Sequence, residues 1–138
     1  MNSIKIRYTF RHKGSGNIEM KWYSIGQLEE RAAAKLSPVF SDEYELISRD
    51  LYTGLKDKNG REKVYEMDIV KFGLSNQIGV ICYDIHQAKF KIVPVQFYHA
   101  NAGCGGWTGH SLRKTVPMEV IGNIYQNPDL LLEAAEEC

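Results

Sequence analysis

The sequence of residues 51–72 is LYTGLKDKNGREKVYEMDIVKF, and it organises the prediction of the fold. Gly54 is free to take a positive φ, which predicts a tight turn around it. Asn59-Gly60 is a strong hairpin signal because both residues tolerate the left-handed region, and it predicts a second turn. The β-branched and aromatic residues at 69–72 then predict a strand.

Two acidic residues, Glu66 and Asp68, stand directly before this strand. Carboxylates at such a position accept hydrogen bonds from backbone amides or face solvent. The alternative hypothesis is that the two residues act as a catalytic carboxylate pair. No set of His, Cys or Ser residues that could act as base and nucleophile stands nearby in the sequence, so we predict no enzyme.

These motifs resemble those of the YopX family, small proteins of bacteriophages and of prophages in low-GC Gram-positive bacteria. The resemblance covers most of the chain, including a closing block at 120–131, VIGNIYQNPDLL, and is weakest over 77–115. It implies a small SH3-like barrel, and the family has no established activity. The residues that carry the family motifs are Tyr52, Thr53, Gly54, Asp57, Asn59, Gly60, Tyr65, Glu66, Asp68, Ile121, Gly122 and Asn123.

One departure from the family pattern is Met67, which stands where the family usually has glycine. Either the unusual backbone angle that glycine permits is absent here, or a methionine side chain has room at this position.

Composition narrows the class of protein. The 138 residues suffice for one domain, or for one domain with a small appendage. Lys plus Arg equals Asp plus Glu, 17 each, and this balance argues against a dedicated nucleic-acid binder. We expect no membrane span and no signal peptide, because the chain has no sufficiently long apolar run. Three cysteines without a framework spacing fit the reducing cytoplasm of a host cell.

The first fifty residues predict a ββαβ unit. Apolar and polar residues alternate over 4–10 and again over 18–23, which predicts a hairpin. Ser24 begins a capping box, and the helix that it predicts ends at Pro38. A third strand is predicted at 44–49.

Four cations on this hairpin form a candidate nucleic-acid site: Lys5, Arg7, Arg11 and Lys21. We expect them to share the outer face of the sheet. Such a face is either simply solvated or a patch that contacts phosphates, with Tyr23 available for stacking on bases.

The pattern of residues 51–138 predicts a second structural unit, a small barrel with a short C-terminal helix. Strands are predicted at 69–72, 77–83, 89–94 and 120–125, and residues 95–98 extend the third of them past a bulge at Pro94. Short strands linked by tight turns need closure to protect their edges, which favours an SH3-like barrel. The overall class is therefore α+β, mostly β.

The terminal helix begins with Asn127 at the N-cap and Pro128 at the first helical position. It carries three leucines in a row, and a helix can bury only part of such a run on one side. Leu131 and Leu132 therefore either pack against their own barrel or meet another subunit.

The glycine-rich segment 98–115 carries the remaining candidates. His99, Cys104 and His110 are weak zinc ligands, with Cys82 or His86 as a fourth, because their spacing lacks a close pair. A Cys104 nucleophile lacks an oxyanion hole and an orienting acid. The loop could instead present Trp107 to a partner, together with Tyr98, or Trp107 could fold back onto the barrel.

The function that these observations favour is a non-enzymatic phage or prophage accessory protein that acts as a protein-interaction module. We expect a host or phage protein as its partner, or a second copy of the chain, and no cofactor. The alternative is a nucleic-acid-binding accessory protein that uses the basic hairpin face and the small barrel.

Overall fold

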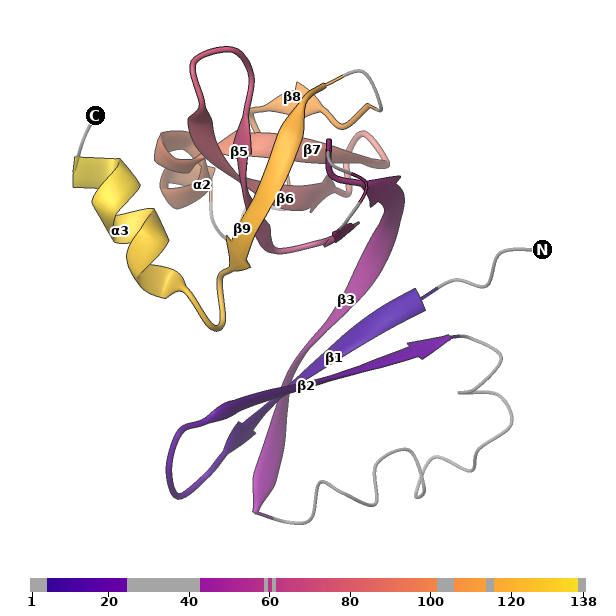
Figure 1. Cartoon of the computed structure of the whole chain (residues 1–138), viewed down its shortest axis with the longest axis vertical. Coiled ribbons are helices and arrows are strands. Elements are labelled where there is room, and N and C mark those ends of the chain that lie inside the picture. Colours follow the sequence, from indigo (N-terminus) through magenta and orange to yellow (C-terminus); the bar gives the residue numbers. More distant parts are fainter. Residues whose placement is uncertain are drawn as a thin grey trace. The chain divides into compact units, whose positions relative to one another are not determined.

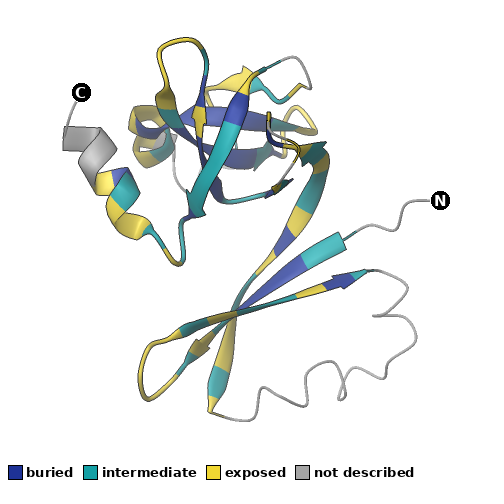
Figure 2. Ribbon diagram, viewed as in Figure 1, coloured by how far each residue is buried: buried dark blue, intermediate teal, exposed yellow. Residues whose placement is uncertain are grey.

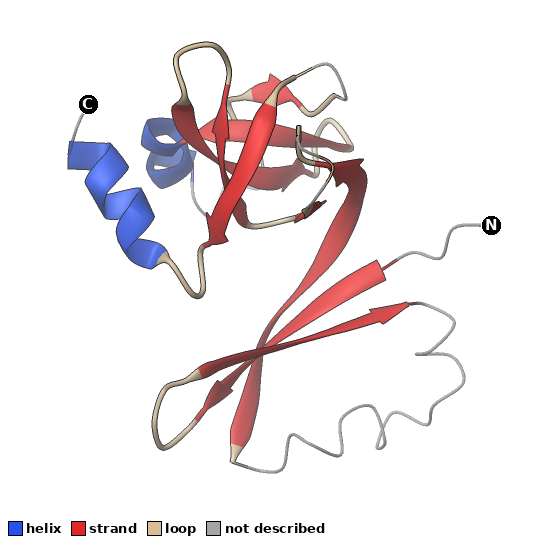
Figure 3. Ribbon diagram, viewed as in Figure 1, coloured by secondary structure: helices blue, strands red, loops and turns tan. Residues whose placement is uncertain are grey.

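The computed structural model describes residues 5–24, 43–58, 60, 62–101, 106–113 and 116–136. Over these residues the chain is mostly β, with two short helices, so the prediction of an α+β, mostly-β protein is confirmed (Figure 3). The chain divides into two compact units, Met1–Tyr52 and Thr53–Cys138. The predicted boundary follows residue 50.

The first unit is an antiparallel sheet in which β1, Lys5–His12, lies between two partners (Figure 1). The partners are β2, Ile18–Ser24, and β3, Tyr44–Lys56. The predicted hairpin is confirmed, and Gly16 supplies a positive φ of 76° in its turn. The predicted helix lies outside the described residues, apart from Ser24, which is the last residue of β2.

The strand β3 is longer than predicted because it continues through Gly54. Gly54 has a φ of 91°, so its conformational freedom serves a kink inside a strand, and the predicted tight turn around it is wrong. The second predicted turn is confirmed. The Asp57 N–H donates to the Glu62 carbonyl and the Gly60 N–H donates to the Asp57 carbonyl, both at 2.9 Å, before β4 begins at Lys63.

The second unit contains a five-stranded antiparallel sheet with the order β8-β7-β6-β5-β9. The strands are β5 Asp68–Phe72, β6 Gln77–Asp84, β7 Lys89–Pro94, β8 His110–Ser111 and β9 Met118–Asn123. β8 and β9 stand at the two ends of this order, and no pairing among the described residues joins them. The predicted closed barrel is therefore not formed.

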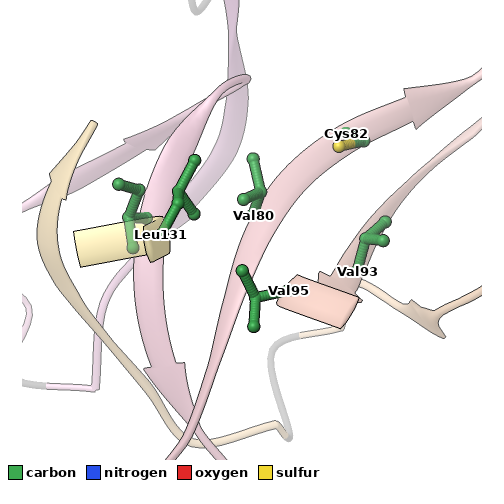
Figure 4. Packing of buried hydrophobic residues seen from close by; sticks show 6 residues of the cluster. Val80, Cys82, Val93, Val95 and Leu131 are labelled. Carbon is green, nitrogen blue, oxygen red and sulfur yellow. The ribbon is translucent and has the colours of Figure 1, made fainter. Parts of the chain in front are cut away.

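Both faces of this sheet are covered, which explains why β5 to β7 are buried almost throughout (Figure 2). On one face, Val95 of α2, Val95–Asn101, and Leu131 of α3, Pro128–Glu136, pack with Val80, Cys82 and Val93 (Figure 4). On the other face, Val64 of β4 is fully buried against a second cluster, and Leu55 of β3 packs on that cluster.

The helix α2 corrects the prediction that residues 95–98 extend the preceding strand. Val95 is buried and Tyr98, one helical turn on, packs against the same cluster, whereas Gln96 and Phe97 between them are exposed. The apolar positions therefore follow helical spacing, and Pro94 ends β7. The terminal helix begins at Pro128 as predicted, and the Leu130 N–H donates to the Asn127 carbonyl at 3.1 Å.

Among the described residues, no helix has the length and apolar character that crossing a membrane requires.

Candidate functional site

A buried ion pair joins the hairpin of β6 and β7 to the segment that leads into β8. The Lys91 ammonium donates to Asp84 Oδ2 at 2.8 Å and to the Trp107 carbonyl at 2.7 Å. The Trp107 N–H donates to the same Asp84 oxygen at 3.0 Å. We call this arrangement of Asp84, Lys91 and the Trp107 backbone the Asp84 clamp. It fixes the backbone of residue 107 from both its donor and its acceptor side.

Asp84 is held as a carboxylate by these donors. Its Oδ1 accepts the backbone N–H groups of His86 at 2.9 Å and Gln87 at 3.0 Å. The Lys91 ammonium, then the Trp107 N–H, and then these two amides lower the pKa of Asp84 well below its usual range, while burial opposes them. Every oxygen of the carboxylate is engaged in holding the fold, so Asp84 is a structural group.

Trp107 folds back onto its own unit. Its indole stacks on the Tyr98 ring of α2, with centroids 5.4 Å apart and planes 5° from parallel. Both side chains are half-buried and pack on the cluster of Val80 and Cys82. Of the two interpretations of Trp107, the structure shows the one in which its side chain packs on its own unit.

Gly109 brings the chain from Trp107 onto the sheet. A Cβ at this position would lie 2.5 Å from the Ile92 carbonyl oxygen and 3.0 Å from Val93 Cα, so the backbones of 109 and β7 approach too closely for any side chain. Directly after it, β8 pairs with β7, with Ser111 opposite Lys91. The clamp and this close approach together position the edge strand.

A groove of about 530 Å³ lies beside this edge strand. Its volume falls within the roughly 300–1,000 Å³ of ligand pockets in proteins. We call it the β8 groove, and its lining residues come from β3, β7 and β8 and the residues that follow β8: Thr53, Leu55, Lys89, Phe90, Ser111, Leu112 and Arg113.

The lining of the β8 groove is apolar in part, and its charged residues are all basic. Leu55, Phe90 and Leu112 are half-buried and pack at the margin of the second core cluster. Lys89 and Arg113 are exposed, and neither forms an ion pair with a described residue. The lining includes no acidic residue. The groove therefore suits an apolar group next to an anion.

A comparison with protein families matches residues 14–132 to the family described as YopX protein. The chain belongs to the YopX family. The match spans both units and most of the sequence, including the segments whose motifs suggested it. A search of curated proteins finds no match.

The YopX motif at 52–60 shapes the return from β3 to β4. The Thr53 hydroxyl donates to the Val64 carbonyl at 2.8 Å and accepts the Leu55 N–H at 3.2 Å, so it bridges the two strands beside Gly54. Asp57 is buried, and its side chain accepts the Glu62 N–H at 3.4 Å. Asn59 lies outside the described residues.

The YopX motif at 65–68 is a tight connection into β5. Asp68 is buried and its Oδ2 accepts the Tyr65 N–H at 2.8 Å, as expected of an acid that binds a backbone amide. Met67 keeps the unusual backbone angle, with a φ of 69°. Its N–H donates to the Ile81 carbonyl at 2.7 Å and its carbonyl accepts the Ile124 N–H at 3.1 Å. The half-buried methionine side chain therefore has room without giving up the glycine-like conformation.

The closing YopX motif caps the end of β9. A Cβ on Gly122 would lie 2.5 Å from Asn127 Oδ1, so glycine leaves the space that the Asn127 side chain fills. Asn127 Oδ1 accepts the Asn123 N–H at 3.2 Å, and Asn123 Oδ1 accepts the N–H groups of Tyr125 and Gln126. Ile121 packs on the cluster that holds Leu131. These motif residues have structural roles.

The four cations of the N-terminal hairpin that were predicted to form a nucleic-acid site do not share one face of the sheet. Lys21 stands opposite Tyr8, whereas Arg7 stands opposite Trp22, so Lys21 and Arg7 lie on different faces of the sheet. The shared outer face is therefore a wrong prediction.

The individual members of that set are also unsuited to a joint phosphate site. Arg7 is buried and lies 3.6 Å from the carboxylate of Asp50. Arg11 pairs with Glu45 at 3.5 Å, and Lys5 is half-buried at the start of β1. Tyr23, which was to stack on bases, is buried against the edge of Tyr8 with centroids 5.3 Å apart.

The predicted interaction residues of α3 divide between core and surface. Leu131 is 6% exposed and packs with Val80 and Val95, so it belongs to the core of its own unit. Leu132 is 62% exposed. Leu131 is thus corrected to a core residue, and Leu132 remains on the surface.

The predicted metal and nucleophile candidates are scattered or lie outside the described residues. His99 is exposed on α2 and His110 is exposed on β8, where its ring lies 5.6 Å from that of Phe72. Cys104 is outside the described residues. Cys82 is fully buried, and burial, followed by the charge of Glu66, raises the pKa of its thiol. Within the described residues, no three His, Cys, Asp or Glu side chains group as metal ligands.

Sequence reasoning missed most of the residues of the β8 groove, although Thr53 was singled out as a motif residue. The signal that could have pointed to it is the run Ser111-Leu112-Arg113, two residues after Gly109, which places a hydroxyl, an apolar group and a cation in succession. The run becomes a site because the end of β3 lies across from it.

Proposed function

We propose that this YopX protein is a non-enzymatic protein-interaction module of a bacteriophage or prophage, acting in the cytoplasm of the host cell. It binds a polypeptide partner in the β8 groove. The observation that carries the proposal is a groove of about 530 Å³ with a partly apolar lining and two cations that form no ion pair with a described residue.

The use of three buried carboxylates in the second unit supports a role without catalysis. Asp57, Asp68 and Asp84 each accept backbone N–H groups, so their oxygens serve the turns that they stabilise. A general acid or base needs a carboxyl that can exchange a proton with a substrate. The groove itself is lined by hydroxyl, apolar and basic groups.

The partner is a protein of the host or of the phage. An interface that begins from a groove of this kind gains its energy from a buried apolar anchor with polar contacts around it. The apolar lining favours a polypeptide over a nucleic acid, whose binding rests mostly on phosphate contacts. A formal net charge of zero supports the same choice.

Site-specific photo-crosslinking tests the proposal. A photoreactive amino acid replaces Lys89 in the groove or, as a matched control, Lys71, an exposed lysine of β5 in the same sheet. After irradiation in host lysate, crosslinked proteins are identified by mass spectrometry and their direct binding is measured with purified components. We expect a protein crosslinked from position 89 at least tenfold more than from position 71.

Equal crosslinking from positions 89 and 71 would contradict the proposal. Recovery of nuclease-sensitive nucleic acid instead of protein would also contradict it and would favour the nucleic-acid alternative. In that case binding would fall steeply with salt concentration.

A further inference from the structure

The edge strand β8 offers backbone groups to the groove. In an antiparallel ladder, successive residues alternate between facing the partner strand and facing away from it. The Leu112 N–H donates to the Phe90 carbonyl at 3.0 Å, so residue 112 faces β7. Ser111, its neighbour opposite Lys91, therefore directs its backbone N–H and C=O away from β7.

No described strand pairs with this outer edge of β8, which stands at the end of the sheet order. Ser111 also lines the groove. An outward N–H and C=O on one residue form the two hydrogen bonds of one antiparallel pair, which is how an extended peptide adds to a sheet edge.

The side chains around this edge specify what such a peptide carries. Leu55, Phe90 and Leu112 supply an apolar lining, and Lys89 and Arg113 supply positive charge without an acid among the lining residues. Both cations are exposed and form no ion pair with a described residue. Opposite charge steers a partner to such a site and sets its preference among similar sequences.

We propose that the partner of the β8 groove is an extended peptide segment that adds to β8 as a strand, with one apolar side chain in the groove and acidic residues beside it. This inference rests on the proposed function and names the class of polypeptide that the groove binds. The backbone of Ser111 pairs with the peptide, and Arg113 selects its charge.

The probe is a library of N-acetylated eight-residue peptides with a central leucine, the other positions being Glu, Gln, Lys, Ser or Thr. The full chain is immobilised, and retained peptides are sequenced. We expect glutamate-rich peptides to be retained at least tenfold over lysine-rich ones. Arg113→Glu should abolish this preference, because the new carboxylate offsets the charge of Lys89, whereas the matched control Lys71→Glu should leave it unchanged.

Peptide N-methylation tests the strand pairing itself. The strongest glutamate-rich peptide is remade with a single N-methyl group at each position in turn, which removes one backbone donor at a time. We expect methylation at the residue that pairs with Ser111 to weaken binding at least tenfold and methylation at its two neighbours to weaken it less.

Three results would overturn the inference. The first is equal retention of glutamate-rich and lysine-rich peptides, and the second is binding that is insensitive to N-methylation at every position. The third is displacement of the bound peptide by a single-stranded oligonucleotide at a lower concentration than the free peptide needs. If crosslinking from position 89 identifies a protein while no library peptide is retained, strand addition is wrong and the proposed function stands. If position 89 also crosslinks no protein above position 71, both are wrong.

Discussion

The Asp84 clamp and the β8 groove each contain a lysine of β7, and the two lysines use their charge in opposite ways. Lys91 is buried and donates to a carboxylate and to a carbonyl of its own chain. Lys89, two residues earlier, is exposed and lines the groove without an ion pair to a described residue. A lysine that is buried with a partner therefore holds the fold, whereas an exposed cation beside a partly apolar groove is available to a ligand.

The largest effect is expected from Lys91→Met. The change leaves the Asp84 carboxylate buried without its ammonium partner and removes a donor from the Trp107 carbonyl, and breaking a buried ion pair from one side is strongly destabilising. Chemical denaturation should show a greater loss of stability than any other change considered below. Tryptophan fluorescence should report loss of the Trp107–Tyr98 stack.

The matched control is Lys89→Met, which should change the free energy of unfolding by less than about 0.5 kcal/mol because the side chain is exposed. Similar losses of stability in the two variants would contradict the different roles of Lys91 and Lys89.

The second largest effect on stability is expected from acidification, which should weaken the Asp84 clamp. The folded-state pKa of Asp84 lies below its value in the unfolded chain, which is about 3.9 for an aspartate. Its contribution to stability is therefore complete above that pH and is lost as the pH falls through the window beneath it.

Urea denaturation between pH 7 and pH 2 checks this expectation. Asp84→Asn should remove the part of the acid sensitivity that Asp84 supplies, so the stability curves of the variant and of the natural sequence should converge at low pH. Parallel curves over the whole range would show that Asp84 does not titrate as described.

Gly109→Ala should have an intermediate effect. The added Cβ would meet the Ile92 carbonyl oxygen at 2.5 Å, and because this is a backbone atom the two chain segments must shift apart, at a cost of about 1–3 kcal/mol. The loss should appear in the denaturation midpoint and as faster hydrogen exchange in β8.

Gly106→Ala is the control in the same segment, because its Cβ would meet the ring of the exposed His86 at 2.9 Å, and that side chain can move. A control as destabilising as Gly109→Ala would show that the approach of residue 109 to β7 does not position the edge strand.

The smallest effect on stability is expected from Arg113→Glu. The residue is exposed and in no ion pair with a described residue, so the free energy of unfolding should change by less than about 0.5 kcal/mol. Binding of glutamate-rich peptides should nevertheless be lost, which calorimetric titration would measure. A variant that unfolds more easily would place Arg113 among the structural residues, and a variant that binds as before would contradict its role in selecting the charge of the peptide.

The elements that the sequence predicted well are those whose local pattern has one interpretation. The apolar run of β6 is bounded by turn residues, and Asn127-Pro128 marks the start of α3 by cap chemistry alone. The short run at 95–98 has a boundary residue only before it, Pro94, so its composition fits a strand as well as a helix, and packing on the core made it a helix.

Faces and sites were harder to predict because they depend on register and on distant contacts. Alternation along β1 and β2 shows which residues share a face within a strand, but the pairing of Tyr8 with Lys21 fixes how the two strands match. The two-residue β8 has no periodicity of its own, and the groove beside it needs the end of β3. The sequence alone also does not show that the side chain of Asn127 fills the space beside Gly122.

The separation of a structural clamp from a binding groove can be tested by a nuclear magnetic resonance titration of the isotope-labelled full chain with the strongest glutamate-rich peptide. We predict that the amide signals of Ser111, Leu112 and Arg113 shift, that the Ser111 amide becomes protected from exchange, and that the Trp107 indole signal stays in place. Shifts centred on Trp107 and Tyr98, with β8 unchanged, would contradict the assignment of the clamp to structure and the groove to binding.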